Sequence, residues 1–299
     1  AVDSWSGAWV SDQASVQALP GTVSAALARH GIKLESLTPR ANSVEVRIRL
    51  ARNENGAQAL GRTARVLTAT MPASVGQFEI VPLINGLPLS KTIIARADME
   101  ALENDANQGA LIRQRSQIVT AGAPAADALR PPGIYPKFTY SFAPYIRSSI
   151  FDPDSPFMAD LGLRFSAKYE LAPGLTLSGS MTKKIVGNLD NSTRVSDSIL
   201  PHVRSDSNLY DKFGDPALET LTLSWHGKPG QNVYTRVTAG YLERMFGGVS
   251  AEVLWKPVDS RLALGAELNY VKQRDFDQGF GFTNYSVLTG HVSGYYTFN

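Results

Sequence analysis

The stretch RLALGAELNY, residues 261–270, decides how the second half of this chain is interpreted. Successive side chains of an extended chain point to opposite faces, so Leu262, Leu264 and Leu268 share one face. The opposite face carries polar residues such as Glu267 and Asn269. The same alternation recurs in eight segments after residue 136, and no helical pattern lies between them to cover the apolar faces. The fold therefore depends on whether this apolar face meets a protein core or lipid.

Composition excludes several classes of protein. The 299 residues are 43% hydrophobic and 19% charged with a net charge of +2, which argues against disorder and against a nucleic-acid partner. The absence of cysteine excludes disulfides, thiolate metal sites and a lipid-bearing cysteine within these residues. No run of about 18 apolar residues is present, so the sequence predicts no transmembrane helix.

Residues 1–125 predict a small α+β domain. The patterns predict helices over 22–31, 56–71 and near 97–103, and strands over 33–37 and 43–51. Residues 77–96 predict two further strands around Asn85-Gly86, a strong hairpin signal. Residues 104–134 are rich in Ala, Gly, Pro and Gln and are interpreted as a connector, with 126–134 as the linker itself.

The region 135–299 predicts about eight antiparallel strands joined by unequal turns. Short turns such as Ala172-Pro173-Gly174 alternate with mostly longer connections, among them FDPDSPF (151–157), residues 188–216 and DFDQGFGF (275–282). Bacterial outer-membrane barrels have short periplasmic turns and long external loops, and their strands need about 10 residues to span the membrane. A soluble β-sandwich is the alternative, because it also alternates, but it gives no reason for unequal turns. We therefore predict a transmembrane β-barrel or barrel segment.

Two long segments resemble a known family. They are AGYLERMFGGVSAEVLWKP (239–257) and SRLALGAELNYVKQRDFDQGFGFTNYSVLTGHVSGYY (260–296). Both are similar to the YjbH-like outer-membrane family, which is associated with exopolysaccharide and group 4 capsule export, and the resemblance extends over about 135–299. It implies a role in polysaccharide secretion at the bacterial outer membrane, with the first domain in the periplasm. The implied partners are a polysaccharide, outer-membrane lipid and export proteins of the periplasm or outer membrane.

Members of that family are longer and contain more strands, so we expect this chain to be a fragment. The strand number matters, because a closed eight-stranded barrel is filled by its own side chains and would not pass a polymer. A closed barrel that only anchors the first domain in the membrane is therefore an alternative function.

Seven charged residues on the polar faces of the predicted strands are candidates for the wall of the lumen. They are Arg164, Lys168, Glu170, Arg236, Glu252, Arg261 and Glu267. Two interpretations stay open: a channel wall that hydrogen-bonds a hydroxyl-rich polymer, or a charge-paired plug that fills a small barrel.

Two loops combine carboxylates with aromatic rings and are candidates for sugar contact. They contain Phe151, Asp152, Asp154 and Phe157, and Asp275, Phe276 and Asp277. An ordinary acidic turn is the preferred interpretation of each. Two carboxylates are too few for Ca²⁺, which takes six to eight oxygen ligands, so we predict no metal site and no cofactor.

The sequence does not predict an enzyme. His202, Ser205 and Asp206 lie close together in the 188–216 loop, but closeness in sequence does not supply the geometry of a catalytic triad. A hydrolase or acyltransferase at the barrel rim is kept as an alternative. Six arginines of the first domain could form a docking face for a partner, although a solvated face is the preferred interpretation: Arg40, Arg47, Arg49, Arg52, Arg62 and Arg65.

Overall fold

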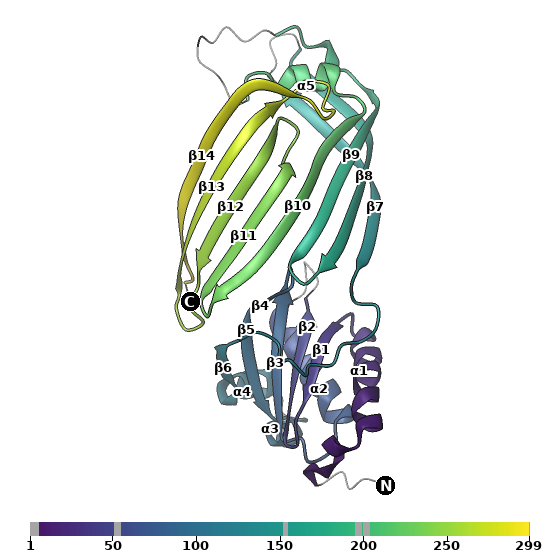
Figure 1. Ribbon diagram of the computed structural model, residues 1–299, viewed down its shortest axis with the longest axis vertical. Helices are drawn as coiled ribbons and strands as arrows, with labels where there is room; N and C mark the ends of the chain where they lie inside the picture. The colour runs from purple at the N-terminus through teal and green to yellow at the C-terminus, as the bar shows by residue number, and fades with distance from the viewer. Residues whose placement is uncertain (1–5, 51–54, 152–154, 195–198, 200–203, 299) are drawn as a thin grey trace. The chain divides into compact units, whose positions relative to one another are not determined.

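The computed structural model describes residues 6–50, 55–151, 155–194, 199 and 204–298, which form two compact units (Figure 1). The first unit is built from the residues up to Ile134, and the second contains the eight long strands that follow Tyr135. No helix of the described residues is long and apolar enough to cross a membrane.

The first unit is an α+β domain. Its elements in chain order are η1 (Gly7–Ser11), α1 (Gln13–Ala28), β1 (Lys33–Pro39), β2 (Ser43–Arg49), α2 (Gly56–Thr70), β3 (Gln77–Ile84), β4 (Leu87–Pro88), β5 (Ser90–Ala95), α3 (Arg96–Ala101), α4 (Gln108–Arg115) and β6 (Gln117–Thr120). The strand order is β1-β2-β3-β5-β6, and β4 pairs with β3. Strands β2 and β3 are parallel because α2 carries the chain back between them.

The core of this unit forms where the sheet meets α1 and α2. Val44, Val46 and Ile48 alternate along β2 and are fully buried, together with Val23 of α1 and Leu67 of α2. The predicted alternation of β2 is therefore confirmed, and so is the hairpin. Asn85 and Gly86 have φ angles of 50° and 78°, as a tight turn between β3 and β4 requires.

Two expectations for the first unit were incomplete. Helix α1 begins nine residues before the predicted start at residue 22, because Asp12 caps its first turn and the helix continues through the buried Pro20. Residues 104–134 are not only a connector. They contain α4 and also β6, which completes the sheet by pairing with β5.

The second unit is an eight-stranded antiparallel sheet. Its strands are β7 (Lys137–Ile150), β8 (Phe157–Ala172), β9 (Leu175–Gly187), β10 (Ala217–Gly230), β11 (Val233–Tyr241), β12 (Phe246–Trp255), β13 (Leu262–Arg274) and β14 (Phe282–Tyr296). They follow one another in sequence order across the sheet, as predicted. The long connection between β9 and β10 carries η2 (Leu189–Asn191) and α5 (Ser207–Phe213).

The sheet is open in the part of the chain that the structure describes. Strand β7 pairs only with β8, and β14 pairs only with β13, so the described strands do not close on themselves. The eight predicted strands are confirmed, whereas a closed eight-stranded barrel is not what these residues form. Because the sheet is open, the interpretation of a small closed barrel filled by its own side chains does not describe this structure.

Glycines permit close strand contacts at one place in the sheet. Gly240 and Gly248 face each other across β11 and β12 with φ angles of 128° and 155°. A Cβ atom on either would lie 2.2 Å from a carbonyl oxygen of the neighbouring strand, that of Leu221 or Tyr270. Only glycine fits both the backbone conformation and the space.

Candidate functional site: the polar face of the second sheet

In this sheet the apolar face is exposed and the polar face is partly buried, which is the reverse of a soluble sheet. The apolar side chains are the exposed ones: Phe142 is 70% exposed, Leu268 55% and Val292 84%. Along β13 they alternate with half-buried or buried positions such as Glu267 and Asn269. No described element therefore forms a shared core on the apolar face.

Hydroxyl groups form regular rungs across the polar face. Ser166 of β8 pairs with Ser180 of β9, which pairs with Thr220 of β10, and the Ser180 and Thr220 hydroxyl oxygens are 2.9 Å apart. The rungs repeat along the strands, since the Ser178 and Thr222 hydroxyls are 3.1 Å apart and those of Ser224 and Thr238 are 3.0 Å apart. Each hydroxyl can donate and accept hydrogen bonds, so this surface can contact other hydroxyl groups.

One charged rung contains three of the predicted wall residues. Arg236, Glu252 and Glu267 lie opposite one another on β11, β12 and β13, and His291 of β14 continues the rung. The Arg236 guanidinium is 3.0 Å from the Glu252 carboxylate and 3.3 Å from that of Glu267. The sequence placed these residues on one face, and the strand register brings them into contact.

The other predicted wall residues lie elsewhere on the sheet. Lys168 and Glu170 form a local ion pair of 2.8 Å on β8. Arg164, also on β8, pairs with Glu219. Arg261 precedes β13 and is exposed at the end with short turns. Six of the seven residues thus form separate pairs and rungs along the face, and Arg261 lies at its end.

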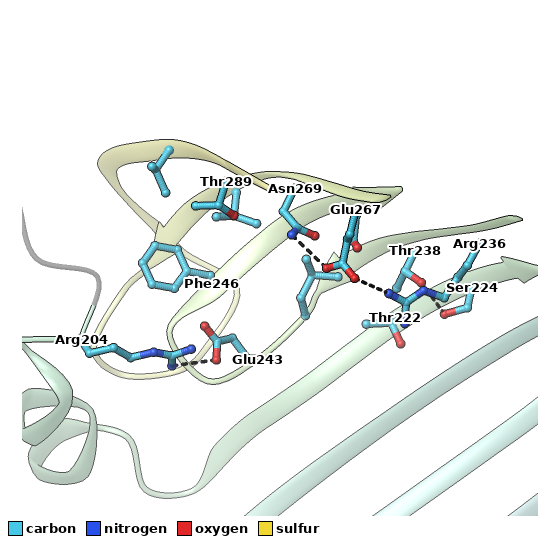
Figure 2. Close-up of a pocket in the computed structure, with 14 residues that line it drawn as sticks. Arg204, Thr222, Ser224, Arg236, Thr238, Glu243, Phe246, Glu267, Asn269 and Thr289 are labelled. Atoms are coloured by element: carbon cyan, nitrogen blue, oxygen red, sulfur yellow. Dashed lines mark hydrogen bonds and ion pairs between the residues drawn. The ribbon is translucent and has the colours of Figure 1, made fainter. Parts of the chain in front are cut away.

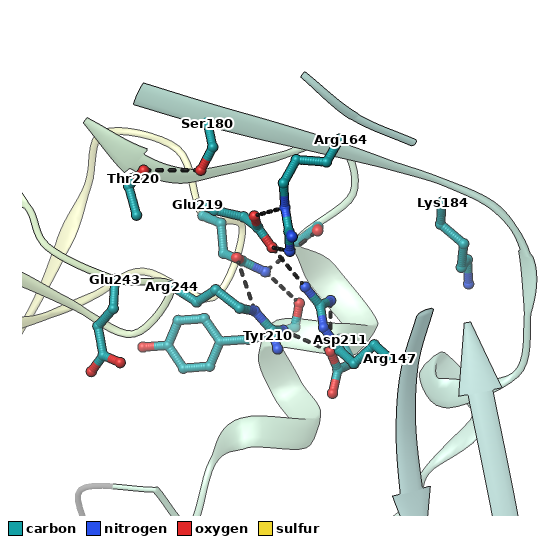
Figure 3. Close-up of polar contacts among 12 residues, drawn as sticks. Arg147, Arg164, Ser180, Lys184, Tyr210, Asp211, Glu219, Thr220, Glu243 and Arg244 are labelled. Carbon is teal, nitrogen blue, oxygen red and sulfur yellow. Dashed lines mark hydrogen bonds and ion pairs between the residues drawn. The ribbon is translucent and has the colours of Figure 1, made fainter. Parts of the chain in front are cut away.

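Glu219 is the centre of a charged cluster that the sequence did not reveal (Figure 3). Its carboxylate accepts hydrogen bonds from Arg164 at 2.8 Å and from Arg147 at 3.0 Å, and its side chain is 9% exposed. Strict alternation from Leu221 would place Glu219 on the apolar face. A register shift between Leu218 and Thr220 turns it to the polar face instead.

Helix α5 covers part of the polar face at the end with long loops. Asp211 of α5 accepts hydrogen bonds from Arg147 of β7 at 3.2 Å and from Arg244 at 2.6 Å (Figure 3). Tyr210 is fully buried, and its hydroxyl donates to the carbonyl of Arg274 at 2.6 Å. Burial raises the pKa of the Tyr210 phenol to about 12, so the hydroxyl stays protonated at neutral pH and donates this hydrogen bond.

Arg274 is a second functional residue that the sequence pattern missed. Its guanidinium is fully buried and donates to the carbonyls of Glu219, Glu243, Gln278 and Gly279 at 2.8–3.1 Å. It also lies 4.6 Å from the ring centre of Tyr241. An arginine at the end of a strand and before a Gly-rich loop was the available signal, but two of its contacts, those with Glu219 and Glu243, come from distant segments.

The predicted sugar-contact loops have different surroundings. Phe151 and Phe157 are exposed, while Asp152 and Asp154 lie outside the described residues. In the second loop, Phe276 packs against Tyr210 with ring centres 5.1 Å apart. The Asp277 carboxylate accepts a hydrogen bond from the Gly279 amide at 2.8 Å. Phe276 therefore stabilises α5, and Asp277 stabilises the turn.

Neither the catalytic alternative nor a metal site gains support from the described residues. His202 lies outside them, and Asp206 is a weak acceptor for Gln273 at 3.5 Å. The described part of the chain contains no group of three or more side chains suited to a metal ion.

Three of the first unit's six candidate docking arginines form ion pairs within the chain. Arg47 pairs with Glu45 and Arg49 with Glu35, and both arginines are largely buried on the face of the sheet opposite the helices. Arg40 pairs with Asp127 at 2.7 Å, and Arg52 lies outside the described residues. The arginines of the sheet therefore do not form a free basic surface.

These features define a class of protein: an antiparallel sheet with paired polar groups on one face and exposed apolar side chains on the other. The chain belongs to the YjbH family, whose model, described as exopolysaccharide biosynthesis protein YbjH, matches residues 9–299. It is 36% identical over 167 residues to the uncharacterized lipoprotein YjbH of Escherichia coli (strain K12). That match covers 54% of this chain and 24% of the relative, so the chain spans about a quarter of the relative's length. No solved structure matches.

Proposed function

We propose that this chain is part of an outer-membrane protein that serves exopolysaccharide secretion without covalent chemistry. The eight strands form part of the wall of a transmembrane β-barrel, and the first unit lies in the periplasm. The apolar face contacts lipid and the polar face lines an aqueous path for the polysaccharide. Family membership supports the link to exopolysaccharide, and the remaining steps rest on the sheet itself.

One observation carries the proposal: each of the eight strands carries large apolar side chains on one exposed face of the sheet. Leaving them in water is unfavourable by about 25 cal/mol for each Å² of apolar surface, whereas lipid removes that cost. The strands are 9–16 residues long, which is sufficient to cross the hydrocarbon layer when tilted. Backbone groups in lipid must be paired, so β7 and β14 need further strands beside them in the membrane.

The chain offers a direct test because it contains no cysteine. Leu268→Cys and Asn269→Cys place neighbouring residues of β13 on opposite faces. Each is labelled with a nitroxide in the full chain reconstituted in lipid vesicles. Electron paramagnetic resonance then measures collisions with oxygen, which partitions into lipid, and with a water-soluble nickel chelate.

We expect the label at 268 to collide mainly with oxygen and the label at 269 mainly with the chelate. The pair Val292→Cys and Ser293→Cys repeats the comparison on β14. If the labels at 268 and 292 collide with the chelate as often as those at 269 and 293, the apolar face is not in lipid and the proposal is wrong.

A second function, a membrane anchor with an obstructed lumen, is favoured by the position of α5. This helix is bound to the polar face through Asp211 and Tyr210 and occupies space that a polymer would need. Conductance of the reconstituted protein across a planar bilayer separates the two functions. A steady current favours the conduit, and its absence favours the anchor.

A further inference from the structure

We propose that a cavity on the polar face of β10–β14 is a binding site for an uncharged, hydroxyl-rich saccharide. This inference rests on the proposed function and names the class of polymer that the wall accepts. The site would exclude polyanionic glycans such as those that contain uronates. The family description names an exopolysaccharide without giving its charge.

The cavity is of the size of a ligand site. Its volume is about 540 Å³, within the range of about 300–1,000 Å³ typical of small-molecule sites. Side chains of β10 to β14, of the loop before β10 and of the connection between β11 and β12 line it. Figure 2 draws these side chains as sticks. Because these strands are neighbours in one sheet, the lining side chains are held at fixed spacing.

The charges in the cavity are paired within the protein. Arg204 is 2.8 Å from Glu243 at one end, and Arg236 is 3.3 Å from Glu267 at the other (Figure 2). Arg236 also pairs with Glu252, so two carboxylates share one guanidinium. The rung therefore has a net negative charge. An anionic sugar would be repelled there, and a cationic one would compete with Arg236 for the two carboxylates.

Neutral side chains lie between the two ion pairs, and they are both apolar (Leu242, Phe246, Val271 and Val287) and polar. Hydroxyls come from Thr222, Ser224, Thr238, Ser250 and Thr289, and an amide comes from Asn269. The Asn269 amide donates to Glu267 at 3.0 Å, which orients its carbonyl oxygen as a free acceptor. Sugar hydroxyls both donate and accept hydrogen bonds, so a lining of hydroxyl, amide and carboxylate groups matches them.

The test uses the full chain in detergent micelles and isothermal titration calorimetry. The neutral probes are maltohexaose, cellohexaose and laminarihexaose. An alginate hexamer is the anionic probe and a chitosan hexamer the cationic probe. We expect at least one neutral probe to bind and the alginate hexamer to bind at least tenfold more weakly.

Variants locate the binding. Thr238→Val removes one hydroxyl from the cavity without changing its volume, and we expect two- to tenfold weaker binding, about the effect of one lost hydrogen bond. Thr297→Val is the matched control, because Thr297 is exposed beyond the end of β14 and does not line the cavity. We expect it to bind like the unmodified chain.

Every other outcome overturns the inference. No binding by any neutral probe, equal or tighter binding of the alginate or chitosan hexamer, or binding unaffected by Thr238→Val would each do so. None of these results contradicts the membrane proposal, because the nitroxide measurements at 268 and 269 decide it independently.

Discussion

At the residue scale, Glu219 shows how one irregularity relocates a charge. The register shift at Leu218 and Thr220 turns its carboxylate to the polar face, where it joins Arg147 of β7 and Arg164 of β8. The three strands are thereby connected by charge-assisted hydrogen bonds in addition to their backbone pairing. Its side chain is 9% exposed, so water cannot replace these partners.

Glu219→Gln should destabilise the second unit by about 2–3 kcal/mol, because it leaves Arg164 without a carboxylate partner and Arg147 with Asp211 alone. Unfolding by urea in detergent micelles, followed by tryptophan fluorescence, measures the free energy of unfolding. Glu252→Gln is the control: it breaks a similar pair, but Glu252 is 34% exposed, so we expect less than about 1 kcal/mol. Equal effects of the two variants would contradict this account of Glu219.

At the element scale, helix α2 depends on its first turn. The Asn55 side-chain oxygen accepts hydrogen bonds from the amides of Ala57 at 3.0 Å and Gln58 at 3.4 Å. These amides have no partner within the helix, so the cap stabilises the whole element. The buried residues of α2, among them Val66 and Leu67, contribute to the core of the first unit.

Asn55→Ala should cost about 1 kcal/mol, whereas Asn55→Asp should cost little because it keeps the acceptor. Hydrogen exchange of the α2 amides, measured by mass spectrometry, should be faster in the alanine variant only. Similar exchange in both variants would show that the cap is not needed.

Strands β2, β3 and β5 are joined by Lys91, which lies 2.7 Å from Glu45 and 2.5 Å from Glu79. Burial raises the pKa of Glu45, but the hydrogen bond from Lys91 and the charge of Arg47 outweigh it, so the pKa lies below its usual value. Burial lowers the pKa of Lys91, but its hydrogen bonds to Glu45 and Glu79 and their charges outweigh burial, so the pKa lies above its usual value.

The stability of the first unit should therefore be highest between about pH 5 and pH 10. The contribution of Glu45 is complete above the pKa of the unfolded carboxyl and is lost as pH falls through the lower folded pKa. The contribution of Lys91 is complete below its unfolded pKa and is lost as pH rises through the raised folded pKa. Urea midpoints from pH 3 to pH 11 measure both limbs. Glu45→Gln should flatten the acid limb, and an unchanged acid limb would contradict the assignment.

At the scale of the whole molecule, the two sheets differ in whether their apolar side chains are buried or exposed. The first sheet buries its apolar residues under helices, while the second leaves them exposed and pairs its polar groups instead. Trp9 belongs to the first arrangement, being 4% exposed. Trp225 and Trp255 belong to the second, being 49% and 41% exposed on the apolar face.

Brominated lipids, which quench tryptophan fluorescence on contact, should distinguish these residues in reconstituted vesicles. A variant that keeps only Trp225 or only Trp255 should be strongly quenched, because aromatic side chains on a lipid-facing sheet contact acyl chains or head groups. A variant that keeps only Trp9 is the control and should not be quenched. Equal quenching of all three would contradict the proposed membrane position of the sheet.

The sequence alone determined the elements with a clear period. Alternation identified all eight strands of the second sheet, and Asn85-Gly86 identified the hairpin, because both signals are local and depend on backbone geometry. Alternation also placed Arg236, Glu252 and Glu267 on one face. The sequence did not predict the first part of α1, because proline, here Pro20, usually breaks a helix. It did not predict strand β6, because the composition of 104–134 is typical of a loop.

Only the tertiary structure decided which charges meet, that the described sheet is open, and that α5 covers part of the polar face. Glu219 and Asp211 meet Arg147 across 72 and 64 residues of chain, and Arg274 meets Glu219 across 55, through a register shift and a loop that folds back. No local pattern encodes such contacts. They follow from strand register and from burial, which are properties of the assembled sheet.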